Sequence, residues 1–337
     1  MSKEYTHIQS AHCENGVTTG LLRHHDVDFM TEPLAFGIGS GLFYIHIPFL
    51  KINNGPAIAF RNMPGAIFKR TCDALRIKVK KIKFRNEETA KEYLDNKISE
   101  GVPVGCQVGV FHLTYFPKEY RFHFNAHNLI IYGKKGDDYM ISDPVMETVT
   151  SLPTYDLQRA RFAKGPLAPK GHLYFPEKIG TISNEQLRSA IIKGIRRNVR
   201  DMLYIPGNIA GVKGIRYTSK KIRKWRDELG TQKAGLYLGQ IVRMQEEIGT
   251  GGGGFRFLYA AFLQQAAKHL GDNRLLSISE EMTKAGDLWR ASAMKMASIY
   301  KNKNNSQQDF DAIADILLEI YETEKRAFQN LGKLKLS

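Results

Sequence analysis

Near residue 176 the sequence changes its hydrophobic periodicity, and this change limits the folds open to it. Before that point the sequence has short strand-like runs: residues 77–84 alternate apolar residues with lysine, and residues 102–108 read as a buried strand. After it, the β-rich runs stop and long stretches repeat apolar residues at helical spacing. We therefore predict an α+β protein, with a sheet-containing domain over residues 1–175 and an all-α domain over residues 176–337.

The second half contains several stretches of helical periodicity that are long enough to form packed helices. They cover residues 182–202, 218–229, 233–247, 255–270, 274–301 and 307–331. Four glycines, Gly251 to Gly254, precede the fourth stretch, whose first turn carries Arg256. Free N–H groups at the start of a helix are suited to an anion such as a phosphate. The alternatives are a flexible interhelical loop and an Arg256 that pairs with Glu246 or Glu247.

The chain is strongly basic, with 49 Lys and Arg against 34 Asp and Glu and a net charge of +15 over 337 residues. The basic residues gather between Lys193 and Arg226, where only Asp201 opposes them. Such a surface attracts acidic partners, although a solvated helix face has the same composition. The sequence has no helix-turn-helix signature, zinc motif or set of stacking aromatic residues, so we do not expect nucleic acid as a partner.

The remaining composition predicts a cytoplasmic protein without an integral membrane segment. No apolar run reaches the ~18–20 residues that span a membrane, and the N-terminus lacks the apolar segment of a secretory signal. The spacing of Cys13, Cys72 and Cys106 suits neither a disulfide framework nor a zinc site, so we expect no metal. Cys72 and Cys106 are expected to be small packing residues. The oligomeric state stays open.

Cys13 stands at a position suited to catalysis. A polar segment from Gln9 to Gly16 carries it into an apolar run that begins at Val17, which predicts that Cys13 lies in the first turn of a helix. The unpaired N–H groups and the positive dipole end of that turn favour thiolate over thiol, and the thiolate is the nucleophile. Such a cysteine needs a base and a group that orients the base.

A predicted β-hairpin supplies both groups. His127 opens the outgoing strand, residues 134–138 turn, and Asp143 closes the returning strand before Pro144. Antiparallel pairing places His127 and Asp143 at the same open end of the hairpin. We therefore predict Cys13 as nucleophile, His127 as base and Asp143 as orienting carboxylate. His12 and His123 are alternatives for the base, and an aspartate before proline is also ordinary turn chemistry.

A glycine-rich segment lies between these parts. Gly37, Gly39 and Gly41 form a GxGxG pattern with no helical pattern directly after it, which differs from the dinucleotide-binding GxGxxG. Glycines of this kind let the backbone pass close to another element or to a substrate. We therefore keep all three as candidates for binding substrate.

Several of these segments occur in the same order in a known family. They are His12–Glu14, Phe36–Gly41, Pro103–Val104, Leu113–Tyr115 and His127–Pro144. Together, over about residues 8 to 175, they resemble the N-terminal region of the butirosin biosynthesis protein H (BtrH) family, which has a papain-like fold related to bacteriocin peptidases. The second half is similar to the uncharacterised helical domain that accompanies it.

The resemblance implies a cysteine-dependent acyltransferase of natural-product biosynthesis. An acyl group on the phosphopantetheine arm of an acidic acyl carrier protein would form a thioester with Cys13 and then move to an amine or hydroxyl of a small-molecule acceptor. No other cofactor is implied. Tyr115, Gly254 and Arg256 join the glycines as candidates for binding substrate or carrier. A hydrolase of the same fold, which cleaves a peptide, amide or thioester, is the alternative, and a non-catalytic binding protein with a basic face is a third hypothesis.

The oxyanion donor departs from the papain-like pattern. Where papain-like enzymes place a glutamine ahead of the cysteine, this chain has His7, and the nearest glutamine is Gln9. The remaining candidates are Gln9, Ser40 and the backbone N–H of Cys13. Donors of this kind change rates by ~10²–10³, so their identity matters.

Overall fold

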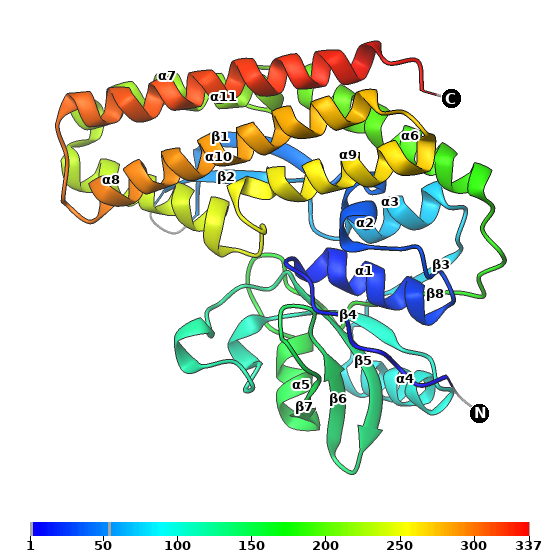
Figure 1. The fold of residues 1–337 in the computed structure, drawn as a ribbon. Helices are drawn as coiled ribbons and strands as arrows, with labels where there is room; N and C mark the ends of the chain where they lie inside the picture. The colour runs from blue at the N-terminus through cyan, green and yellow to red at the C-terminus, as the bar shows by residue number, and fades with distance from the viewer. Residues whose placement is uncertain (1–2, 53–54, 337) are drawn as a thin grey trace. The chain divides into compact units, whose positions relative to one another are not determined.

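The computed structural model describes residues 3–52 and 55–336, and the chain divides into two compact units (Figure 1). The sheet unit consists of Met1–Ala35 and Ile67–Ser183. The helical unit consists of Phe36–Ala66 and Asn184–Ser337. The predicted α+β class and the predicted helical second half are confirmed.

The sheet unit is built on six antiparallel strands in the order β3-β8-β4-β5-β6-β7. Their bounds are β3 Val79–Ile82, β4 Val104–Val108, β5 His127–Lys135, β6 Asp138–Ser142, β7 Thr150–Pro153 and β8 Leu173–Pro176. The accompanying helices are α1 Cys13–His24, α3 Ala66–Ala74, α4 Glu87–Ser99 and α5 Thr154–Arg161, with short 3₁₀ turns at Val110–His112 and Lys118–Tyr120. Helix α2, Glu32–Ile38, crosses from this unit into the other. The predicted hairpin is therefore confirmed as β5 and β6.

Helix α1 lies directly against the sheet because two of its residues have no side chain. A Cβ atom at Gly16 would overlap Pro144, which follows β6, and one at Gly20 would crowd Ile130 of β5. The residues from Cys13 to Leu22 are buried as a result. This close approach brings the N-terminus of α1 to the open end of the β5–β6 hairpin.

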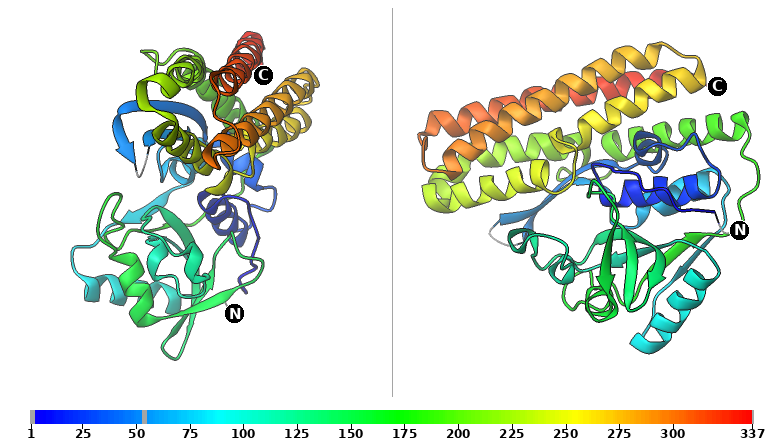
Figure 2. Two further views of the ribbon diagram at one scale, coloured as in Figure 1. Left: turned by 90° about the vertical axis from the view of Figure 1, so that its left-hand side faces the viewer. Right: turned by 60° about the horizontal axis from the view of Figure 1, so that its bottom comes forward.

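The helical unit contains the helices that the periodicity predicts. Their bounds are α6 Asn184–Leu203, α7 Gly211–Leu229, α8 Thr231–Val242, α9 Arg256–Leu270, α10 Arg274–Tyr300 and α11 Gln307–Lys333. A π-helical turn, Arg243–Glu247, and a 3₁₀ turn, Gly253–Phe255, join α8 to α9. Helix α11 packs against both α7 and α10, and the long helices run side by side (Figures 1 and 2).

The division differs from the predicted domains in residues 36–66. The prediction of a domain over 1–175 placed them with the sheet, but they form a hairpin of β1, Leu42–Ile52, and β2, Gly55–Arg61, within the helical unit. Side chains of this segment find their partners on the helices: Phe36 stacks on Phe255, and the Tyr44 hydroxyl lies 2.7 Å from that of Thr218. The helical unit therefore contains a β-hairpin as well as helices. The hairpin belongs to this unit because its side chains pack against residues that are distant in the sequence.

The helical unit encloses a buried ion pair. Arg256 donates from Nε and Nη2 to the two carboxylate oxygens of Glu324, at 2.8 and 2.9 Å, and both side chains are fully buried. Trp289 donates its indole N–H to the same carboxylate at 2.8 Å. Arg256 also donates to the Gly254 carbonyl at 2.7 Å. The guanidinium that the sequence offers as an anion ligand is thus held by Glu324, rather than by Glu246 or Glu247.

Replacing Arg256 with methionine should destabilise the helical unit strongly. The change leaves the Glu324 carboxylate buried without its cation, which costs about 3–5 kcal/mol in the free energy of unfolding. Urea unfolding followed by circular dichroism measures this loss. The double variant Arg256→Met/Glu324→Leu should recover most of it, because both charges are then gone.

The matched control is Arg274→Met, which removes an exposed partner of Asp272 and should cost less than ~1 kcal/mol. A double variant that is no more stable than Arg256→Met would contradict the assignment of the loss to an uncompensated charge.

Candidate active site

Cys13 is held in the first turn of α1 by the residues around it. His12 is the N-cap in extended conformation, and its Nδ1 accepts the backbone N–H of Asn15 at 3.3 Å. The Glu32 carboxylate accepts the backbone N–H groups of Ala11 and His12 at 2.9 and 2.8 Å. The chain entering the helix is therefore fixed on both sides of the cap, and Cys13 lies at the positive end of the helix dipole, as predicted.

The predicted base and orienting carboxylate meet at the end of the hairpin. Nε2 of His127 and Oδ2 of Asp143 lie 2.7 Å apart, and both side chains are buried. The same Oδ2 accepts the hydroxyl of Tyr115 at 2.7 Å, and Oδ1 accepts the N–H of Val145 at 3.2 Å. Asp143 therefore has a donor on each oxygen and a defined orientation. Tyr115, one of the candidate binding residues, instead positions Asp143.

The electrostatics of His127 connect Asp143 to Cys13. Burial alone would lower the pKa of His127, but the charges of Asp143 and Cys13 and hydrogen bonds to both outweigh it and raise that pKa to about 10. Because Nε2 bonds Asp143, Nδ1 is the ring atom left for Cys13. An imidazolium beside a sulfur stabilises the thiolate form. The structure thus brings together the three side chains that the sequence singles out.

Among the residues discussed as oxyanion donors, His7 and Ser40 make other hydrogen bonds, and Gln9 is exposed. Nδ1 of His7 lies 2.7 Å from the Ser142 hydroxyl, and Nε2 lies 3.0 Å from the Met146 carbonyl, so both ring nitrogens are engaged. Ser40 belongs to the helical unit, where its hydroxyl donates to the Gly194 carbonyl at 3.2 Å.

Asn128 lies beside Cys13 and was missed by the sequence analysis. Its Nδ2 lies 4.0 Å from the Cys13 sulfur and donates to the Ala126 carbonyl at 3.1 Å. The Tyr174 hydroxyl donates to its Oδ1 at 2.8 Å. In the sequence this asparagine is only the second residue of a strand, and the β8 tyrosine that holds it is a long-range neighbour that no local pattern reveals.

The glycines considered as binding candidates serve close contacts within the helical unit. A Cβ atom at Gly37 would overlap the ring of Phe262, and one at Gly41 would overlap the ring of Phe36. Gly39 is buried in the adjoining turn.

The tetraglycine segment also turns inward. The N–H of Gly253 donates to the carboxylate oxygens of Glu246 at 3.1 and 3.2 Å, and a Cβ atom at Gly254 would overlap Phe60. A carboxylate of the protein itself therefore binds an N–H group ahead of α9 that the sequence made a candidate for anion binding.

Residues 3–52 and 55–336 contain neither a cluster of metal-ligating side chains nor a membrane-spanning helix. Within these ranges, no group of three or more His, Cys, Asp and Glu side chains is arranged to hold a metal ion. No helix there combines the length and the apolar character needed to cross a membrane.

Comparisons with known proteins add the following. Residues 155–331 match the family described as a domain of unknown function (DUF4872), and residues 12–144 match butirosin biosynthesis protein H, N-terminal. The resemblance found in the sequence is thereby confirmed. A crystal structure of a candidate C39-like peptidase from Bacillus anthracis is similar at 13% identity and a TM-score of 0.37, covering 53% of this chain and 96% of that chain. No curated protein matches the chain.

The raised pKa of His127 predicts a pH-dependent stability. The folded protein holds this proton up to a pH of about 10, whereas the ordinary value is 6.5. The stabilisation is therefore complete below pH 6.5 and is lost as the pH rises toward 10. Urea unfolding at intervals across this range should show a falling free energy of unfolding.

The variant Asp143→Asn is the comparison for this measurement. Its neutral amide no longer favours the imidazolium, so the fall should be smaller than in the wild-type protein. Equal slopes in the two proteins would show that other groups cause the pH dependence.

Proposed function

Since the chain belongs to the DUF4872 family and its residues 12–144 match the N-terminal region of the butirosin biosynthesis protein H family, we propose that it is a cysteine-dependent acyltransferase. The donor is a thioester on the phosphopantetheine arm of an acidic acyl carrier protein, and the acceptor is an amine or hydroxyl of a small molecule. The observation that supports this most is the cluster of Cys13, His127 and Asp143, in which a charged imidazole faces the sulfur at a helix N-terminus.

The first half-reaction forms the acyl-enzyme. The Cys13 thiolate attacks the thioester carbonyl carbon, the bond from that carbon to the carrier sulfur breaks, and the carrier thiol leaves with the Nδ1 proton of His127. The enzyme now holds an acyl thioester and a neutral imidazole. Asp143 accepts the hydrogen bond from Nε2–H throughout, while the proton stays on Nε2, and this keeps the ring in one tautomer.

The second half-reaction returns the site to its starting state. The acceptor amine or hydroxyl attacks the acyl carbon while Nδ1 of His127 takes its proton. The bond to Cys13 breaks, and the sulfur leaves as thiolate beside the restored imidazolium. Water in the acceptor position would give hydrolysis by the same steps, so the acceptor and not the triad separates transferase from hydrolase.

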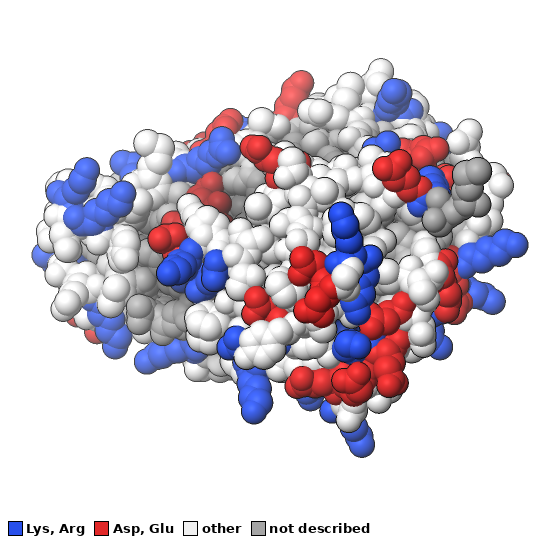
Figure 3. All heavy atoms as spheres, turned by 90° about the horizontal axis from the view of Figure 1, so that it is seen from below, with Lys and Arg blue, Asp and Glu red and all other residues white. Residues whose placement is uncertain are grey.

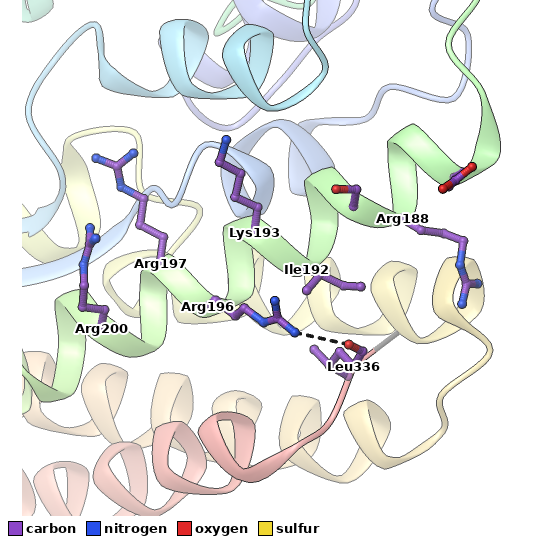
Figure 4. Close-up of a pocket in the computed structure, with 9 residues that line it drawn as sticks. Arg188, Ile192, Lys193, Arg196, Arg197, Arg200 and Leu336 are labelled. Atoms are coloured by element: carbon purple, nitrogen blue, oxygen red, sulfur yellow. Dashed lines mark hydrogen bonds between the residues drawn. The ribbon is translucent and has the colours of Figure 1, made fainter.

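A basic groove on the helical unit supports the proposal that the acyl donor is an acidic protein. It has a volume of about 750 Å³ and runs along α6 (Figure 4). Its lining residues are Glu185, Arg188, Ser189, Ile192, Lys193, Arg196, Arg197, Arg200 and Leu336. One acid thus stands against five basic side chains. Complementary charge steers an acidic partner to such a surface.

Other parts of the surface differ from this groove. The face in Figure 3 carries basic and acidic side chains together, with acidic ones gathered along one edge. The excess of positive charge is therefore not uniform. We assign the docking of the carrier to the α6 groove, where one sign of charge dominates.

Incubation with an acyl-loaded carrier protein should acylate Cys13. Intact mass spectrometry should show the mass of one acyl group on the wild-type protein and none on Cys13→Ser. Cys72→Ser is the control and should keep the adduct, since burial raises the pKa of the Cys72 thiol and leaves it unreactive. The absence of an adduct with every thioester donor tested would count against acyl transfer, and release of the free acid without an acceptor would indicate a hydrolase.

Reversing charge in the groove should weaken docking alone. Arg196→Glu/Arg200→Glu should raise KM for the loaded carrier by at least ~10-fold with little change in kcat, because long-range attraction is lost. Acylation by a small thioester that lacks the carrier protein should be unaffected.

Lys295→Glu/Lys301→Glu, which changes the charge of α10 and its C-cap by the same amount, is the matched control. Equal effects of the two double variants on KM would show that total charge acts instead of the groove.

A further inference from the structure

Attack of Cys13 on a carbonyl group forms an oxyanion, and the side chains first considered do not supply a fixed donor for it. His7 and Ser40 are engaged elsewhere, and Gln9 is exposed. We propose that Asn128 is this donor, and that its Nδ2–H stabilises the oxyanion formed when Cys13 attacks a carbonyl group. The inference rests on the acyl-transfer function proposed above.

The distance between Asn128 and the sulfur fits this role. Nδ2 lies 4.0 Å from the Cys13 sulfur, which is long for a strong hydrogen bond to the thiolate itself. The oxyanion lies two bonds beyond the sulfur, on the attacked carbon, so an amide at this separation can approach it at hydrogen-bond distance. The backbone N–H of Cys13, in the first turn of α1, has no acceptor within the helix and provides a second donor.

The amide of Asn128 is oriented before any substrate arrives. The Ala126 carbonyl requires a donor and therefore faces Nδ2, while the Tyr174 hydroxyl donates to Oδ1. These contacts decide which end of the amide faces the sulfur. Gly105 on the neighbouring strand β4 makes room for the Tyr174 ring, which a Cβ atom there would crowd. A buried donor that is held in place needs no reorganisation during the reaction, and this is the property that makes such donors effective.

The step moves no proton to or from Asn128. As the carbon–sulfur bond to Cys13 forms, the carbonyl π electrons move to oxygen, which accepts the Nδ2–H hydrogen bond. As the bond from the carbon to the leaving sulfur breaks, these electrons return and restore the carbonyl. Asn128 therefore stabilises only the charge between the two events, and its loss should affect acylation without changing the thiolate.

Two reagents, used on the full-length protein, distinguish an effect of Asn128 on the oxyanion from an effect on the thiolate. p-Nitrophenyl acetate acylates a thiolate through an oxyanion, whereas iodoacetamide alkylates it by displacement at a saturated carbon and forms none. Asn128→Leu should slow acylation of Cys13 by ~10²–10³, as the loss of an oxyanion donor does elsewhere, and should leave the alkylation rate unchanged. Mass spectrometry of the Cys13 peptide measures both rates.

Two further variants test the orientation of the Asn128 amide and the alternative donor Gln9. Tyr174→Phe keeps the amide but removes the hydrogen bond that orients it, so acylation should fall by less than in Asn128→Leu and alkylation should stay the same. Gln9→Ala removes the exposed amide nearest Cys13 in the sequence and should change neither rate. Normal alkylation also shows that each variant is folded around a working Cys13–His127 pair.

The remaining outcomes overturn the assignment. Equal losses of acylation and alkylation in Asn128→Leu would mean that Asn128 acts on the thiolate or on the fold. Unchanged acylation would exclude it as a donor, and a loss in Gln9→Ala would assign the role to Gln9. A wild-type protein that is alkylated but never acylated at Cys13 would remove the acyl-transfer function itself, and the role of Asn128 with it.

Discussion

The hydrogen bond between His127 and Asp143 is the interaction on which the rest of the site depends. At 2.7 Å and between two buried side chains, it lets a charged imidazole persist inside the sheet unit, where burial alone would favour the neutral ring. Tyr115 and the Val145 N–H hold the carboxylate from its other sides. Helix α1 then needs only to deliver its first residue, Cys13, to this end of the hairpin. Gly16 makes that approach possible by leaving room for Pro144.

The same requirement, that buried charge be compensated, explains several features outside the cluster of Cys13, His127 and Asp143. Glu32 binds the backbone ahead of Cys13, and Glu14, buried beside it, accepts the N–H of Ile67 at the start of α3. In the helical unit, Glu324 neutralises Arg256 and also accepts the Trp289 indole. Each of these carboxylates joins segments far apart in the chain. Asp143 thus shapes the electrostatics of the site, Glu32 and Glu14 connect segments that carry the site, and Glu324 connects helices of the helical unit.

Prediction from sequence succeeded where the physical cause is local. The helices of the second half follow from their own hydrophobic spacing, and the hairpin follows from two β-rich runs around a turn. Because antiparallel pairing makes the ends of a hairpin neighbours, the meeting of His127 and Asp143 could be foreseen as well. Prediction failed where a residue had several chemically reasonable partners. Arg256 had Glu246 and Glu247 nearby in the sequence, yet Glu324 of α11 holds it. The glycines near residue 254 were suited to an anion, and Glu246 took that place.

The sequence by itself thus determined the helices of the second half, the helix-start position of Cys13 and the hairpin that carries its partners, because spacing and turn residues act over a few neighbours. Tertiary structure alone decided that residues 36–66 belong with the helices, that Tyr115 supports Asp143, and that Asn128 lies beside the sulfur with its amide oxygen bonded to Tyr174. These outcomes depend on which surfaces are buried together. That choice is made by the whole set of packed elements, and no short segment of the chain contains it.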